Sequence, residues 1–140
     1  MILLDTTVLI YAFGTEHELD EPARRLVAAI ADGRLRATAT VAVIEEFVHV
    51  HSRYSSRSEA VKLGSRYIDL LGPLVFSSEN ALRRSLQLFD RHREIGAFDA
   101  VLAATAMEVG VEALVSGDGG FASIPALPFV HLVDADQLLT

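Results

Sequence analysis

ILLD, residues 2–5, is a short apolar run that ends abruptly on Asp5. A run of apolar residues without alternation is typical of a central strand in a parallel sheet, where helices cover both faces. The run ALVSGD, residues 113–118, repeats this pattern and ends on Asp118. Because open α/β sheets bind ligands at the carboxyl ends of their strands, we expect both aspartates at the binding edge of one sheet.

Helical and strand-like segments alternate along the rest of the chain. We expect helices over residues 21–32, 41–51, 58–71, 79–93 and 98–109, with Ser58 and Ser78 as N-caps and Gly110 as the end of the last helix. Strands are expected at residues 2–4, 35–40, 74–76, 113–115 and 129–133, and a loop at 117–128. This alternation predicts a single α/β domain over residues 1–140, in three layers, with a central parallel sheet of about five strands and helices on both faces.

The composition excludes several classes of protein. The 140 residues are 51% hydrophobic, which is enough for a buried core and argues against disorder. The absence of cysteine excludes disulfides, thiolate zinc sites and cysteine nucleophiles. No apolar run approaches the ~20 residues of a membrane span, and Asp5 interrupts the first run too early for a signal peptide. We therefore expect a cytoplasmic protein without a membrane segment.

The formal net charge of −7 at first argues against nucleic acid as a partner. The charge is uneven, however. Residues 34–66 carry six basic and three acidic residues, whereas residues 94–140 carry seven acidic residues and neither lysine nor arginine. If part of the acidity binds metal ions, the net charge no longer excludes a phosphate-containing substrate.

Two further acids stand in helices. Asp99 lies in the first turn of the predicted helix 98–109, and Glu46 lies beside Glu45 in the apolar helix 41–51. Ordinary roles are open to all four acids, because aspartate is frequent in turns and at helix starts and Glu46 fits a solvated stripe. If the four converge, their carboxylates repel one another. A hard divalent cation relieves that repulsion, and oxygen ligands suit Mg²⁺ or Mn²⁺.

Four motifs make the sequence recognisable. They are MILLDTTVLIY (residues 1–11), TVAVIEEF (40–47), AFDAVLAATA (97–106) and LVSGDGGF (114–121). In this order they resemble the motifs of PIN-domain ribonucleases, and the length and single-domain build resemble the VapC-type toxins of toxin–antitoxin pairs. The resemblance implies that an acidic quartet holds the metal: Asp5, Glu46, Asp99 and Asp118. Glu46 fits better than Glu45 because it directly precedes a bulky apolar residue, Phe47, whereas helical spacing does not decide between them.

The resemblance implies a Mg²⁺-dependent endoribonuclease, with Mn²⁺ as a substitute, that hydrolyses RNA with a metal-activated water. It also implies a homodimer, for which the region 58–93 offers apolar residues, and a cognate antitoxin that covers the acidic pocket. The hydroxyls of Thr6, Thr7 and Ser116 are candidates for hydrogen bonds to a carboxylate or phosphate. The candidate contacts to the RNA backbone are Arg34, Arg36, Arg53 and Arg57.

The sequence departs from the family pattern at two places. Thr7 stands where many members have asparagine, and Gly119 and Gly120 follow Asp118 where charged residues are frequent, which leaves the number of metal ions open.

Two other functions remain open: a degenerate PIN-like module that binds without cutting, and an aspartate-based phosphatase. The phosphatase would need a second aspartate where Thr7 stands, and a lysine, of which the chain has only Lys62. A zinc site is disfavoured, because His49 and His51 do not share a helix face.

Overall fold

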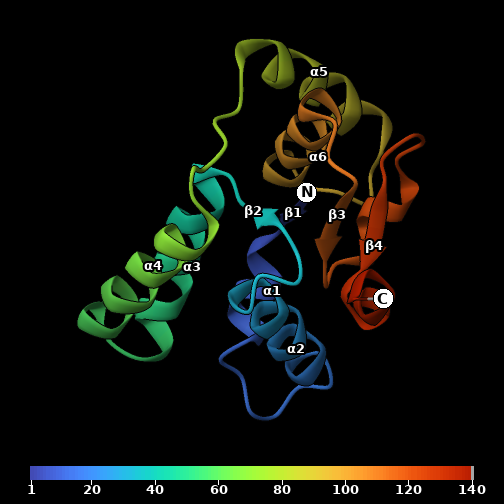
Figure 1. Cartoon of the computed structure of the whole chain (residues 1–140). Coiled ribbons are helices and arrows are strands. Elements are labelled where there is room, and N and C mark those ends of the chain that lie inside the picture. Colours follow the sequence, from blue (N-terminus) through green and yellow to red (C-terminus); the bar gives the residue numbers. More distant parts are fainter. Residues whose placement is uncertain (140) are drawn as a thin grey trace.

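The computed structural model describes residues 1–139 and places a four-stranded, all-parallel sheet at the centre of the molecule (Figure 1). The strand order is β2-β1-β3-β4. The strands are β1 (Ile2–Leu4), β2 (Ala37–Thr38), β3 (Ala113–Ser116) and β4 (Phe129–His131). The predicted α/β class with a parallel sheet flanked by helices is confirmed.

Six α-helices surround this sheet in the described part of the chain. They are α1 (Thr6–Tyr11), α2 (Asp20–Ala31), α3 (Val41–Tyr54), α4 (Arg57–Leu71), α5 (Glu79–Arg91) and α6 (Ala97–Val109). Figure 1 shows α5 and α6 on one side of the sheet, α1 and α2 on the other, and the α3–α4 hairpin beyond the β2 edge. Two 3₁₀ segments complete the fold, η1 (Gly119–Ser123) and η2 (Leu132–Leu139).

The register of the two central strands fixes the functional edge. Leu4 lies opposite Val115, and the backbone N–H of Asp5 donates to the carbonyl of Val115 at 2.9 Å. The two strands therefore end within one residue of each other, and Asp5, which follows β1, lies beside Ser116 at the end of β3. The sheet places together two acids that are more than one hundred residues apart in sequence.

An aromatic cluster joins the α3–α4 hairpin to the rest of the domain. Phe47 of α3 is fully buried and meets Tyr67 of α4 edge-on, with ring centroids 4.9 Å apart. The Tyr67 hydroxyl donates to the Leu9 carbonyl at the end of α1 at 2.9 Å. This buried bond satisfies a carbonyl that the short helix α1 leaves open. No helix within residues 1–139 is long and apolar enough to cross a membrane.

Three local features differ from the sequence prediction. The segment 74–76 forms no strand and contributes only an isolated parallel bridge between Thr40 and Val75, so the sheet has four strands. The N-cap of α4 is Ser56, whose hydroxyl accepts from the Glu59 N–H, and not Ser58. The helix α1 and the 3₁₀ segment η1 occupy positions where no helix was predicted. Ser78 caps α5 and Gly110, at φ 76°, ends α6, as predicted.

Candidate active site at the carboxyl edge of the sheet

The side chain of Asp5 is held in place at the carboxyl edge of the sheet. Its side chain is only 5% exposed and accepts hydrogen bonds at Oδ2 from Ser116 Oγ (2.6 Å) and Thr7 Oγ1 (3.1 Å). Burial raises the pKa of this carboxyl above its ordinary value, and the hydrogen bonds from Ser116, the Thr6 backbone and Thr7 partly oppose the effect. The result is a carboxylate held in one orientation at the bottom of the site.

The same hydroxyls connect the two strand ends. Ser116 Oγ accepts from the Asp118 N–H at 2.9 Å, and Thr7 Oγ1 accepts from the Gly117 N–H at 2.8 Å. The predicted hydrogen-bonding roles of Thr7 and Ser116 toward a carboxylate are therefore present in the structure. Thr6 is buried, and its bond to Asp5 comes from the backbone.

Asp99 shows that the predicted acids share one electrostatic environment. The pKa of Asp99, in the first turn of α6, is raised to about 7 by burial and then by the charges of Asp5, Asp118 and Glu46. The charge of Glu46 also raises the pKa of Asp5, whereas Glu45 contributes to neither. The four predicted acids thus lie near enough to one another for the charges of Asp5, Asp118 and Glu46 to act on Asp99. Glu45 and Glu46 line the same cavity.

The donor set suits a hard divalent cation. All of the acidic groups offer oxygen, and their mutual repulsion is what a cation of charge +2 relieves. Within residues 1–139 no three His, Asp or Glu side chains stand close enough to hold an ion as they are placed. Asp5 is fixed by its hydrogen bonds, whereas Glu46 and Asp118 are exposed, so assembly of a metal site depends on these exposed side chains.

The four arginines proposed for RNA contact do not lie together. Arg36 directly precedes β2, and its carbonyl accepts from the Ile2 N–H, which places it at the amino end of the sheet. Arg34 stands nearby and pairs with Asp32 at 3.5 Å. The structure therefore does not bring these two to the acidic edge. The sequence could have predicted this position. Arg34 and Arg36 precede a strand of a parallel sheet, and residues before such a strand lie at the amino end, opposite the carboxyl edge that binds ligands.

Arg53 and Arg57 stand on the α3–α4 hairpin. Both side chains are exposed, and Arg57 lines a hollow of about 260 Å³ together with His49 and Ser52 of α3. His49 also lines the cavity that contains Glu46. Of the four arginines, Arg57 is thus linked to the acidic edge through neighbouring hollows.

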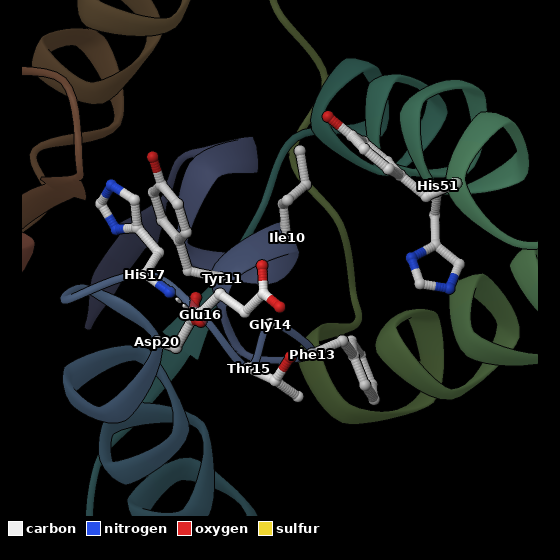
Figure 2. A pocket seen from close by; sticks show the side chains of 10 residues that line it. Ile10, Tyr11, Phe13, Gly14, Thr15, Glu16, His17, Asp20 and His51 are labelled. Carbon is white, nitrogen blue, oxygen red and sulfur yellow. Dashed lines mark hydrogen bonds between the residues drawn. The ribbon is translucent and has the colours of Figure 1, made fainter.

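A larger cavity that the sequence did not indicate adjoins this edge. It measures about 490 Å³, and Figure 2 shows Tyr11 and His17 on one side of it and Phe13 and His51 on the other. Asp20 is buried here: its Oδ2 accepts from the His17 N–H at 2.8 Å, while its Oδ1 has no hydrogen-bond partner among the described residues. Gly117 leaves room for the Tyr11 ring, which brings the cavity next to the strand end that carries Asp118.

Comparison with known proteins identifies the family. The family model of the PIN domain matches residues 2–127. This chain belongs to the PIN-domain family. It is 48% identical over 134 residues to Ribonuclease VapC7 of Mycobacterium tuberculosis, and the match covers 95% of this PIN domain and 91% of that relative.

Solved structures share the fold of this PIN domain. VapC20 of Mycobacterium tuberculosis, described as a sarcin–ricin loop cleaving toxin, has a TM-score of 0.73 at 17% identity, covering 88% of this chain and 94% of that one. FitAcB of Neisseria gonorrhoeae has a TM-score of 0.73 at 18% identity, covering 95% and 99%. A toxin–antitoxin complex from Klebsiella pneumoniae has a TM-score of 0.69 at 20% identity, covering 94% and 98%.

Proposed function

We propose that this PIN domain is a VapC-type ribonuclease toxin, a Mg²⁺-dependent endoribonuclease that hydrolyses RNA phosphodiester bonds in the cytoplasm. The observation that carries the proposal is the parallel pairing of β1 and β3, which places Asp5 beside the strand end that leads to Asp118 at the carboxyl edge of the sheet. The raised pKa of Asp99 supports it, because the charges of Asp5, Asp118 and Glu46 contribute to that shift. The 48% identity to a ribonuclease over nearly the whole chain supports the same function. In this proposal Asp5, Glu46, Asp99 and Asp118 are the metal ligands and the catalytic residues.

In the proposed reaction the cation and the protein have different roles. A bound Mg²⁺ or Mn²⁺ supplies charge for the scissile phosphate and lowers the pKa of an attacking water. Ser116 and Thr7 hold the Asp5 carboxylate in a fixed orientation, so that one ligand is already in place. Such hydrogen bonds to a ligand typically contribute 10- to 100-fold to metal affinity or activity. Because water is the nucleophile, no serine or cysteine nucleophile is needed.

The proposed protein partner is an antitoxin, since toxin–antitoxin complexes occur among the structural neighbours. An arginine of the antitoxin would pair with several carboxylates of the acidic edge and exclude the phosphate. The adjoining cavity, which has aromatic walls and the acids Glu16 and Asp20, suits an apolar and basic segment of such a partner.

The second proposed protein contact is a homodimer. The helix α5 carries an exposed apolar stripe of Leu82, Leu86 and Phe89, at the spacing of one helix face, inside the predicted region 58–93. A stripe of this kind on a helix favours burial against another surface. Sedimentation that shows a monomer at micromolar concentration would contradict the dimer.

The nuclease function is tested by cleavage of total RNA. The unmodified protein and the variants Asp5→Asn, Asp99→Asn and Asp118→Asn are incubated with Mg²⁺, Mn²⁺ or a chelator, and Asp69→Asn, an exposed acid on α4, is the matched control. We expect cleavage by the unmodified protein and the control only, and none with chelator. Cleavage by the variants or in chelator would refute the proposal.

The alternatives give different results in the same experiment. A degenerate PIN module would bind RNA or a partner without ever cutting. A phosphatase would release phosphate from a small monoester. The hydrogen bond from Thr7 to Asp5 disfavours the phosphatase, since a hydroxyl occupies the place where that enzyme needs a second carboxylate.

A further inference from the structure

Phe98 is an exposed aromatic side chain directly beside the acidic edge. It precedes Asp99 at the start of α6, and 84% of its surface is exposed. Single exposed apolar residues are common and need no explanation by themselves. Phe98 differs because it forms part of a cavity that also contains one of the proposed metal ligands.

This cavity, which we call the Phe98 cavity, has a volume of about 400 Å³ and is lined by Thr6, Ala42, Val43, Glu45, Glu46, His49 and Phe98. Its size is that of a small-ligand site. Its walls are apolar at Phe98, Ala42 and Val43, while Glu45 and His49 provide polar groups. An aromatic face with a few polar groups at its border matches the surface of a nucleobase, which has two flat faces and a hydrogen-bonding edge.

A positively charged side chain, that of Arg57, lines the hollow next to the Phe98 cavity. His49 also lines the neighbouring hollow of about 260 Å³ that contains Ser52 and Arg57. The two hollows therefore share His49, and the second one is lined by a guanidinium group. Arginine is well suited to bind the phosphates of a nucleic-acid backbone.

We infer that the Phe98 cavity binds the base of an RNA nucleotide next to the scissile phosphate, with the ring of Phe98 stacked on the base and Arg57 on a following phosphate. The inference rests on the proposed nuclease function. Stacking on Phe98 requires a base that is not paired in a helix, so the substrate is single-stranded at this position. Phe98 is thus a base-binding residue that positions the strand.

Glu45 gives the cavity a preference among bases. Its carboxylate accepts hydrogen bonds only, and an exocyclic amino group is the donor that carboxylates take from cytosine. Adenine and guanine also carry an amino group, whereas uracil does not. The Phe98 cavity therefore favours an amino-bearing base, with Glu45 in its wall as the acceptor.

The test measures RNA binding without cleavage. The probes are short single-stranded RNAs, each of which carries one 2-aminopurine, a fluorescent base with an amino group. The position of this base differs from one RNA to the next. The RNAs are titrated with Asp118→Asn protein, with and without Phe98→Ala. Stacking on an aromatic side chain is typically worth a change in Kd of roughly 5- to 150-fold. We expect a loss of this size for Phe98→Ala, rescue by Phe98→Trp, and fluorescence quenching at one position that disappears with Phe98→Ala.

Phe76→Ala in the same background is the matched control, because Phe76 is 79% exposed and lines none of these hollows. An unchanged Kd and unchanged quenching for Phe98→Ala would overturn the inference. So would an altered oligomeric state of Phe98→Ala with unaltered RNA binding, which would assign Phe98 to a protein contact. If the unmodified protein fails to cut RNA, the nuclease proposal fails, while the position-specific quenching still decides the role of Phe98.

Discussion

Replacing Asp99 by asparagine is expected to stabilise the metal-free protein at neutral and higher pH. The pKa of Asp99 is raised to about 7 by burial and by three neighbouring carboxylates. The folded protein thus holds the Asp99 proton more tightly than the unfolded chain does, and stability falls as the pH rises from about 4 to about 7. Asparagine is never charged, so the variant avoids this loss.

The size of the effect follows from the same pKa. A pKa of about 7 instead of 3.8 corresponds to an upper limit of about 4 kcal/mol in the free energy of unfolding. Asp99 is only half-buried, and solvent screening reduces the value to roughly 1–2 kcal/mol. For a domain of 140 residues this is a rise in Tm of roughly 3–7 °C.

The assay is thermal unfolding followed by circular dichroism, in chelator, at about pH 8 and about pH 4.5. We expect Asp99→Asn to raise Tm at the higher pH and to leave it nearly unchanged at the lower pH. Asp69→Asn, at an exposed position on α4, is expected to change Tm at neither. A lower Tm for Asp99→Asn at pH 8, or a gain that does not depend on pH, would refute the reasoning. The lower Tm would mean that the carboxylate makes a stabilising contact, and the pH-independent gain would mean that the gain does not come from removing the charge.

Three further substitutions test individual contacts by urea unfolding. Ser116→Ala removes the 2.6 Å bond to buried Asp5 and should cost about 1.5–3 kcal/mol, with metal binding weakened roughly 10- to 100-fold in a Mg²⁺ titration. Gly14→Ala places a methyl group against the buried carboxylate of Asp20 and should cost about 1–3 kcal/mol. Tyr67→Phe removes the bond between α4 and the end of α1 and should cost about 1 kcal/mol.

Each of these predictions has a result that would contradict it. Gly119→Ala is the control for Gly14→Ala, since a methyl group there meets no atom within 4 Å, and equal losses for the two would contradict the steric argument. For Ser116→Ala, full metal affinity would show that Asp5 needs no fixed orientation. For Tyr67→Phe, an unchanged free energy of unfolding would show that water replaces the lost donor.

The sequence predicted much of the fold because its helices have clear periods and end signals. Helices α2, α3, α5 and α6 begin or end within a few residues of the predicted bounds. The helix α1 was missed because it has only six residues and contains β-branched Thr6, Thr7 and Val8, which favour strands. The segment 74–76 is apolar like a strand, but pairing depends on the tertiary position of its partner, and only one bridge forms.

The candidate site was predictable where it depends on topology and unpredictable where it depends on side-chain placement. The strand ends that carry Asp5 and Asp118 follow from parallel pairing. Glu45 and Glu46 are both exposed and line the same cavity, so the choice of Glu46 as the metal ligand stays a prediction. The Phe98 cavity arises between elements distant in sequence, and the cavity of Figure 2 is formed mainly by residues 10–20 against α3, so both depend on tertiary packing.

The hydrogen bond between Asp5 and Ser116 also decides when the carboxyl edge is completed during synthesis of the chain. During synthesis Asp5 emerges among the first residues, but its partner on β3 follows more than one hundred residues later. Until β3 pairs with β1, Asp5 lacks both the strand beside it and the hydroxyl that orients it. A nascent or truncated chain that lacks β3 therefore has no assembled carboxyl edge, and under the proposed function its nuclease activity would begin only after β3 has been made.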